Sequence, residues 1–217
     1  MELFSLIGII KIVILVYSAI LHEIAHGYVA YRLGDPTAKL RGRLTLNPIS
    51  HIDPYMTVLI PLLLLITGSP IIFGGAKPVP VDPFNLRDGI KDLSLVSLAG
   101  PLTNIVLAIL GSVLLHIFYP GFRLTDALNH DLGSAIFATI VLINLFLAVF
   151  NLVPIPPLDG SKVFSLLLPP KQAAAYMSLG SVGMIFLMFL LFFPIGGFSL
   201  MNVIYSLVFS SLSLLGL

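Results

Sequence analysis

The stretch Leu21-His22-Glu23-Ile24-Ala25-His26 lies inside an unbroken apolar segment that covers about residues 3–31. A segment of that length can cross a hydrocarbon core about 30 Å thick as a single helix. Three ionisable side chains in five residues are expensive there, at about 2.5–3.5 kcal/mol for each charged residue near the centre of a spanning helix. Packing alone would not select them, so the stretch predicts a membrane helix that carries a polar site.

The spacing of the two histidines predicts a metal site. Residues four apart share one face of a helix, so His22 and His26 can both reach one Zn²⁺ at about 2.0–2.1 Å. Glu23 would lie beside that ion and could take a proton from a bound water. This H-E-x-x-H pattern is typical of zinc metalloproteases. The alternative is a pair of helical histidines bonded to backbone carbonyls, which the cost of polar groups in a bilayer disfavours.

Composition supports a membrane protein. Of the 217 residues 58% are hydrophobic and 10% are charged, and the mean hydropathy is +1.07, whereas soluble domains are about 25% charged. A net charge of +1 excludes a protein that binds nucleic acid or another polyanion through an excess of positive charge. The chain has no cysteine, which excludes disulfides and thiolate metal ligands.

The remaining apolar stretches predict the architecture. A stretch at about 56–73 is interrupted by Pro61, Gly68 and Pro70, so we expect it to re-enter rather than cross. We predict an all-α polytopic membrane protein of one domain, residues 1–217, with about five transmembrane helices and one re-entrant segment. Its catalytic core would cover about 3–165, with a C-terminal helical pair at about 174–216. The five crossings are predicted at about 3–31, 93–118, 133–153, 174–193 and 198–216.

A zinc site needs a third protein ligand, and the acids of the chain restrict the choice. The only glutamates are Glu2 and Glu23, and Glu2 lies about twenty helical residues from the motif, roughly 30 Å away. The extended pattern with a third histidine also fails, because Val29 and Arg32 stand at its Gly and His positions. The third ligand is therefore predicted to be an aspartate or another histidine.

Asp159 is the best candidate for that ligand. It follows three prolines, Pro154, Pro156 and Pro157, which must unwind the end of an apolar helix. Non-helical backbone at membrane depth is tolerated only where protein or a water-filled cavity covers it. In the alternative interpretation the segment is an interfacial turn, and Asp159 caps the next helix.

Three motifs together carry a resemblance to a known family. They are the H-E-x-x-H run, Ala99-Gly100-Pro101-Leu102-Thr103-Asn104, and Asn151-Leu152-Val153-Pro154 with Leu158-Asp159-Gly160. In this order they resemble the site-2 protease family of intramembrane zinc metalloproteases. The match covers about residues 18–165, and three motifs are far more specific than the first alone.

Two further stretches resemble a compact bacterial and archaeal branch of that family. They are Gly42-Arg43-Leu44-Thr45-Leu46-Asn47-Pro48 through His51-Ile52-Asp53-Pro54, and Ala76-Lys77-Pro78-Val79-Pro80-Val81. The chain departs from larger relatives in having no room for PDZ or CBS domains. How substrates are selected and how activity is regulated therefore stay open.

The resemblance implies a role for each site residue. His22, His26 and Asp159 would bind one Zn²⁺, Glu23 would be the general base, and Asn151 would hold the substrate or the oxyanion. The substrate would be a transmembrane protein in the lipid bilayer of a prokaryotic cell membrane. It must unwind locally, by pairing with a strand edge at Leu40–Leu46 or Pro78–Val81, so short β-strands near the site are expected.

Several other polar residues have open roles. Asn144 is expected to make an interhelical hydrogen bond, and His51 to structure a loop rather than to bind metal. Asn104 falls in a stripe of small residues that lets another helix approach, and it can also line the polar site.

The distribution of basic residues predicts the orientation. If 56–73 folds back, nine of the eleven lysines and arginines share one face, with Arg123 opposite and Lys11 inside a span. The positive-inside rule then makes that face cytoplasmic, with the N-terminus outside and the C-terminus inside. The site would open toward the cytoplasm.

Two classes compete with the protease interpretation. One is a catalytically silent membrane scaffold or metal-binding protein of the same fold, which a broken motif would favour; no motif is broken here. The other is a zinc transporter, which should carry several acid or histidine pairs along one path. The chain has one such cluster.

Overall fold

The computed structural model describes residues 6–59, 63, 66, 76–123 and 132–217. Over that part of the chain the protein is helical and contains no β-strand. Three helices are long and apolar enough to cross a membrane, namely α1 (Leu6–Arg32), α4 (Ile90–Phe118) and α5 (Leu132–Asn151), or four crossings if a bent helix pair near the C-terminus counts as one. This supports an integral membrane protein.

Shorter helices fill the connections and the C-terminal region. Between α1 and α4 the described ones are α2 (Thr37–Leu40), η2 (Pro48–His51), η3 (Pro54–Leu59) and η4 (Pro83–Asn85). After α5 the chain forms α6 (Asp159–Phe164), η6 (Ser165–Leu167), α7 (Pro170–Met177), α8 (Gly180–Phe192) and α9 (Leu200–Leu214).

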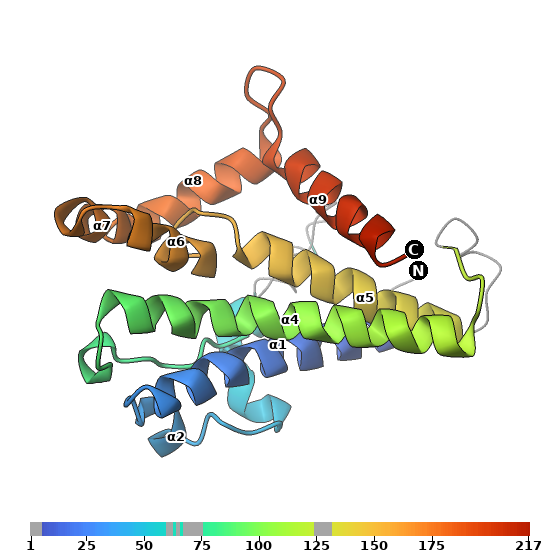
Figure 1. Ribbon diagram of the computed structural model, residues 1–217, viewed down its shortest axis with the longest axis horizontal. Coiled ribbons are helices and arrows are strands. Elements are labelled where there is room, and N and C mark those ends of the chain that lie inside the picture. Colours follow the sequence, from blue (N-terminus) through green and yellow to red (C-terminus); the bar gives the residue numbers. More distant parts are fainter. Residues whose placement is uncertain (1–5, 60–62, 64–65, 67–75, 124–131) are drawn as a thin grey trace.

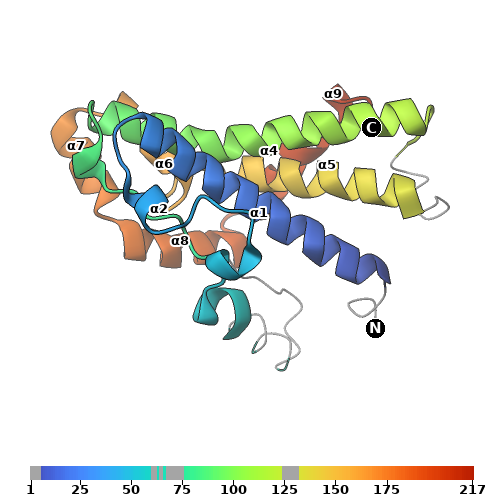
Figure 2. The same cartoon turned by 90° about the horizontal axis from the view of Figure 1, so that it is seen from below.

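The three long helices pack on one another, and α4 runs antiparallel to both α1 and α5 (Figures 1 and 2). Between α1 and α4, His22 contacts Asn104 whereas the later His26 contacts the earlier Val96. Between α4 and α5, Asn104 contacts Asn144, and farther along α4 the ring of Phe118 stacks on that of Phe137. The end of α1, the start of α4 and the end of α5 therefore meet at one end of the bundle, called the site end below.

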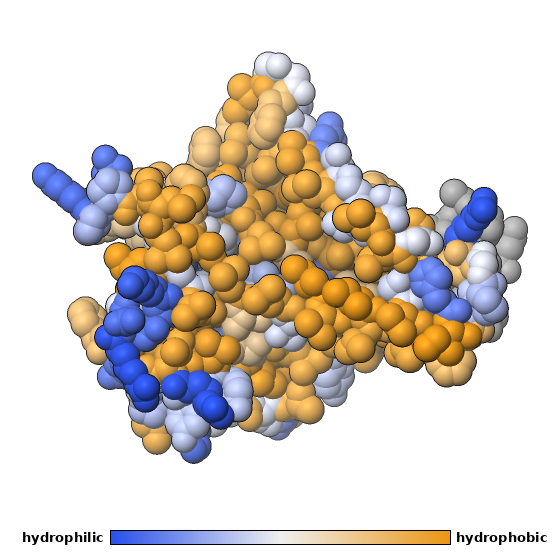
Figure 3. All heavy atoms as spheres, viewed as in Figure 1, coloured by the Kyte–Doolittle hydropathy of each residue, from blue (hydrophilic) through white to orange (hydrophobic). Residues whose placement is uncertain are grey.

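Small side chains set how closely these helices approach. Gly100, Asn104, Ala108 and Ser112 lie at successive i+4 positions of α4, and all four are buried. The packing role predicted for this stripe is confirmed. Large apolar side chains point outward along the same helices, and Figure 3 shows the resulting apolar surface over α4, α5 and α9. A surface of this kind suits lipid contact and is not expected of a soluble monomer.

Asp35 holds the connection between α1 and α4 against the site end. Its carboxylate accepts hydrogen bonds from Thr37, from the backbone N–H of Asp82 at 2.7 Å and from the side chain of Asn85 at 3.1 Å. Burial raises the pKa of Asp35, but these hydrogen bonds to its ionised form lower it more, so the net direction is downward. The segments 36–52 and 76–89 are thereby tied to one another.

Two sequence predictions fall in this connection. The re-entrant segment 56–73 lies mostly outside the described residues, which include only 56–59, 63 and 66 of it. The predicted short strands are not found, because Leu40–Leu46 forms a helix end and turns and Pro78–Val81 runs irregularly. A strand needs a neighbouring backbone to bond, whereas the Val79 N–H donates to the Glu23 carboxylate instead.

The C-terminal region differs from the predicted pair of separate crossings. α7 and α8 form a bent pair with an angle of 70°, and α9 has 15 residues, about 22 Å, which is shorter than a hydrocarbon core. Near the end of α9, the carbonyl of Leu215 accepts a hydrogen bond from Ser112 in the last turns of α4. The C-terminal residue Leu217 and the start of α1 at Leu6 lie at the end of the bundle opposite the site end (Figure 1).

Candidate metal centre

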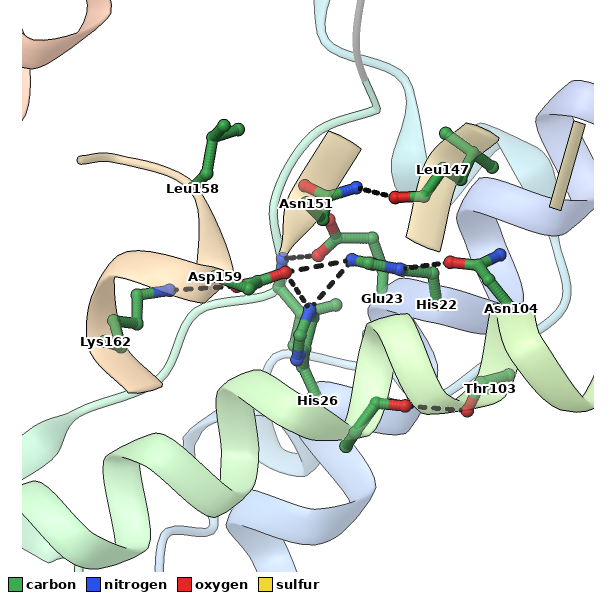
Figure 4. A network of polar contacts seen from close by, with 12 residues as sticks. His22, Glu23, His26, Thr103, Asn104, Leu147, Asn151, Leu158, Asp159 and Lys162 are labelled. Carbon is green, nitrogen blue, oxygen red and sulfur yellow. Dashed lines mark hydrogen bonds and ion pairs between the residues drawn. The ribbon is translucent and has the colours of Figure 1, made fainter. Parts of the chain in front are cut away.

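Three predicted ligand atoms converge at the site end (Figure 4). The Nε2 atoms of His22 and His26 are 3.0 Å apart. Asp159 Oδ2 lies 3.2 Å from the first and 3.1 Å from the second. All three residues are buried. Helix α1 supplies both rings from one face, and the carboxylate comes from the start of α6.

The hydrogen bonds behind the rings define which nitrogen is free. His22 Nδ1 lies 2.6 Å from Asn104 Oδ1, and His26 Nδ1 lies 2.7 Å from the carbonyl oxygen of Val96. Both partners are acceptors, so each Nδ1 carries the proton and donates it. The lone pair of each neutral ring is then on Nε2, the atom that faces Asp159.

This donor set fits a zinc ion. Two Nε2 lone pairs and a carboxylate oxygen face one another, an arrangement that repels unless a cation lies among them. Ligands of a tetrahedral zinc at about 2.0–2.1 Å lie about 3.3–3.4 Å apart, close to the spacing found here. Gly100 leaves the necessary space, since a Cβ on it would lie 2.5 Å from both Nε2 atoms.

A buried chain of amides fixes the orientation of Asn104. Its Nδ2 donates to Asn144 Oδ1 at 2.8 Å. The Nδ2 of Asn144 in turn donates to Ser18 Oγ at 2.9 Å and to the carbonyl of Ile140 at 2.8 Å. Asn104 and Asn144 are fully buried. Each amide can satisfy these partners in one orientation only, which turns the Asn104 oxygen toward His22.

Unwinding of the chain after α5 brings Asp159 to the rings. α5 ends at Asn151, three residues before Pro154, and α6 begins at Asp159. The side chain of the N-cap residue Leu158 makes no capping bond, and the Asp159 carboxylate faces the histidines rather than capping the helix. A Cβ on Gly160 would overlap the carbonyl of Leu152, so glycine permits the close return of the chain.

Charge around Asp159 favours its ionised form. Lys162 Nζ, one helical turn later, lies 3.2 Å from Asp159 Oδ1. Burial raises the pKa of Asp159, whereas the adjacent Lys162 ammonium lowers it. An ionised carboxylate is the form that binds a metal.

A backbone N–H from another segment orients the Glu23 carboxylate. Its Oε2 accepts a hydrogen bond of 2.6 Å from the N–H of Val79. The segment that carries Val79 also packs on α1, because a Cβ on Gly27 would lie 2.8 Å from the Val79 side chain. The Glu23 carboxylate is thus held from outside its own helix.

Asn151 and His51 are placed differently from the three converging residues. Asn151 Nδ2 donates to the carbonyl of Leu147 at 2.9 Å, so its amide is engaged within α5 (Figure 4). His51 is buried in the connection, where its Nε2 lies 2.9 Å from the carbonyl of Thr45 and its own carbonyl accepts from the Lys77 N–H at 2.8 Å. This is the loop-structuring place predicted for it.

Sequence reasoning missed several residues that support the site. Val79 and Val96 act through backbone atoms, and no side-chain pattern marks such roles. Ser18 and Lys162 had a signal that could have found them, because Ser18 is four residues before His22 and Lys162 is three residues after Asp159. Residues at these spacings share a helix face.

Comparison with known proteins agrees with this donor set. The description "Peptidase family M50" matches residues 125–192. A Bacillus subtilis protein named "Putative zinc metalloprotease YwhC" is 40% identical over 190 residues, which cover 87% of this chain and 83% of that protein. A Mycolicibacterium smegmatis protein named "Putative zinc metalloprotease Rip2" is 32% identical over 192 residues, covering 88% and 70%. No solved structure matches the chain.

This degree of similarity defines the family. The chain belongs to peptidase family M50, the site-2 protease family, as the sequence motifs predicted. It is a membrane-bound zinc metalloprotease, and its cofactor is Zn²⁺.

Proposed function

We propose that the protein is an intramembrane endopeptidase that hydrolyses peptide bonds in or near transmembrane segments of membrane proteins. The observation that carries this proposal is the depth of the converging ligand atoms. His22 lies ten residues before the end of α1, about 15 Å along the helix. A site at that depth, between helices with lipid-suited surfaces, is within reach of a substrate that lies in the bilayer.

His22, His26 and Asp159 hold one zinc ion in this proposal. Bound there, zinc keeps a position open for water, lowers the pKa of that water toward about 7 and polarises a carbonyl oxygen. The Nδ1 bonds to Asn104 and Val96 fix the tautomer and the orientation of both rings, with each Nε2 directed at the ion.

Glu23 is the general base. Its carboxylate accepts the proton of the attacking water and then delivers it to the nitrogen of the leaving amine. The Val79 N–H holds this carboxylate in one direction. Asn151 leaves its bond to Leu147 and donates a hydrogen bond to the oxyanion, which stabilises the developing negative charge. The substrate unwinds and lies extended along Pro78–Val81, whose backbone forms no ladder with the described residues.

The topology that suits this function has four crossings. The connection 33–89 leaves α1 and enters α4 at the same end of the bundle, which supports a re-entrant 56–73. The place of Leu215 beside Ser112, opposite the site end, supports a single net crossing by the C-terminal helices α7, α8 and α9 instead of the two predicted. The basic connections at the site end make that end cytoplasmic, with both termini outside. All of residues 1–217 form one protease domain.

Cleavage of a defined transmembrane peptide tests the function. Purified protein is reconstituted in liposomes with a single-span peptide, and the fragments are mapped by mass spectrometry. We expect cuts within the apolar span or within a few residues of its cytoplasmic end. Cuts confined to a soluble segment tethered far from the bilayer would contradict the proposal. A zinc-loaded protein that cleaves no membrane peptide would favour the silent scaffold.

A further inference from the structure

A second polar pocket, separate from the converging ligands, lies in the connection between α1 and α4. It has a volume of about 330 Å³, and its lining residues are Arg41, Arg43, Ser50, Lys77, Pro78 and Pro80. Three of these side chains are cationic. Between Pro36 and Val81 the sequence has one acidic residue, Asp53, which does not line the pocket.

Arg43 is the buried cation of this pocket. Its side chain is 7% exposed. Nη2 donates to the carbonyl of Lys77 at 2.5 Å and lies 3.4 Å from that of Pro78. Its Nε is buried and has no hydrogen-bond partner among the described residues. A buried guanidinium with an unpaired N–H is costly, and an anionic ligand would satisfy both the charge and the donor.

The length of α1 lets us infer that the pocket lies at the level of the lipid headgroups. Leu44 and Val79, next to its lining residues, pack on Gly27. Gly27 is five residues before the end of the crossing helix α1, about 7–8 Å along it. The interface between hydrocarbon and water is therefore expected beside these segments.

Large apolar side chains are exposed in the same connection. Leu40 is 80% exposed, Ile49 is 74% exposed and Tyr55 is 68% exposed. Cationic residues with exposed aliphatic and aromatic neighbours are typical of segments that lie in the headgroup region. An acyl chain can cover the apolar side chains while a phosphate occupies the basic pocket.

We propose that this pocket binds the phosphate of an anionic phospholipid, with Arg43, Arg41 and Lys77 as its cationic partners. Pro78 and Pro80 flank Val79, whose N–H holds the Glu23 carboxylate. Bound lipid fixes this segment and so couples the headgroup composition of the membrane to the orientation of Glu23. Free phosphate offers the same chemistry, so the test compares the two sources.

The test measures lipid binding to the purified, detergent-solubilised protein. Phosphatidylglycerol and phosphatidylcholine with identical acyl chains are titrated separately, and bound lipid is counted by native mass spectrometry. We expect one phosphatidylglycerol per chain to bind and phosphatidylcholine to bind far more weakly. Arg41→Ala with Lys77→Ala removes two exposed cations and should weaken phosphatidylglycerol binding about 30-fold. Arg43→Lys, which keeps the charge and loses the Nε donor, should weaken it to a lesser extent.

Arg87→Ala with Lys91→Ala is the matched control, because both side chains are exposed, one near the end of the connection and one in the first turn of α4, and neither lines the pocket. It should bind phosphatidylglycerol as the wild type does. Equal weakening in the two double variants would overturn the proposal, since it would reduce the effect to net charge. Competition by millimolar inorganic phosphate as strong as that by the lipid would overturn the assignment to a phospholipid. Unchanged elution in size-exclusion chromatography checks that the variants are folded.

Discussion

The hydrogen bonds at Nδ1 of His22 and His26 orient both rings for metal binding through Nε2. Each ring donates its Nδ1 proton, one to the Asn104 side chain and the other to the Val96 carbonyl. The first of these bonds depends on a side-chain amide, which could rotate. Asn144 and Ser18 prevent that rotation, so residues on α1, α4 and α5 jointly determine the tautomer of one ring.

Replacing this chain of amides should weaken zinc binding without removing a ligand. We expect Asn104→Leu to lower zinc affinity about 10- to 100-fold, as loss of a partner behind a ligand does. Asn144→Leu acts one step further away and should have a smaller effect. Zinc affinity is measured by competition with a chelator. Asn202→Leu, at an exposed position of α9, is the control. A zinc affinity of Asn104→Leu equal to that of the wild type would show that the hydrogen bond from His22 to Asn104 does not determine the tautomer of His22.

The ligand assignment separates Asp159 from His51. Asp159→Ala leaves two ligands and should lower zinc content well below one ion per chain and abolish cleavage. His51→Ala should keep its zinc, because its ring contacts Thr45 in the connection. Elemental analysis of both purified variants measures this. Full zinc content in Asp159→Ala together with loss in His51→Ala would reverse the assignment.

At the scale of the elements, α4 contacts the metal site through Gly100, which has no side chain to fill the space for the ion. Gly100→Ala should remove zinc binding, because the added methyl group would lie 2.5 Å from both ligand nitrogens. The helix itself should gain slightly, since alanine favours helix by about 1 kcal/mol over glycine. Loss of zinc with retained thermal stability is therefore the expected pair of results. Gly180→Ala, where a Cβ meets nothing within 4 Å, is the matched control. Normal zinc content in Gly100→Ala would contradict the geometry.

Elements marked by a local sequence pattern could be predicted, whereas those determined by tertiary contacts could not. The apolar runs and Pro154 located α1, α4 and the end of α5 to within a few residues. The sequence predicts Asp159 as the third ligand, because the chain has few acids and because the prolines unwind the helix before it. The predicted strands at 40–46 and 78–81 are not found, because 40–46 forms a helix end and turns and the Val79 N–H bonds a carboxylate far away in sequence. From hydropathy alone, the segments that form α8 and α9 are predicted to be two crossings. A hydropathy profile carries no information on tertiary contacts such as that between Leu215 and Ser112.

At the scale of the whole molecule, the arrangement of α1, α4 and α5 determines on which side the site opens. The nine basic residues outside Lys11 and Arg123 lie at the end of α1, at the start of α4, in the connection between these helices, or in α6 and α7. Figure 2 shows these connections gathered at one end of the long helices. The charge asymmetry and the helix directions therefore agree on one orientation.

Single cysteines test this topology, because the chain has none of its own. In intact cells an impermeant thiol reagent should label Arg123→Cys and Leu217→Cys, which lie opposite the site end. Lys39→Cys and Arg87→Cys should stay protected until the cells are opened. Protection of Leu217→Cys would restore the five-crossing topology. Labelling of Arg87→Cys with protection of Lys39→Cys would show that 56–73 crosses the membrane.

The central claim is that Glu23 performs proton transfer beside a zinc ion that it does not bind. The most direct measurement compares Glu23→Gln with the wild type, both in zinc content and in the rate of cleavage of a transmembrane peptide. The account predicts one zinc per chain in both proteins and a rate at least 10²- to 10⁴-fold lower in the variant, the usual size of a lost general base. Cleavage at the wild-type rate by Glu23→Gln, or loss of its zinc, would contradict the account.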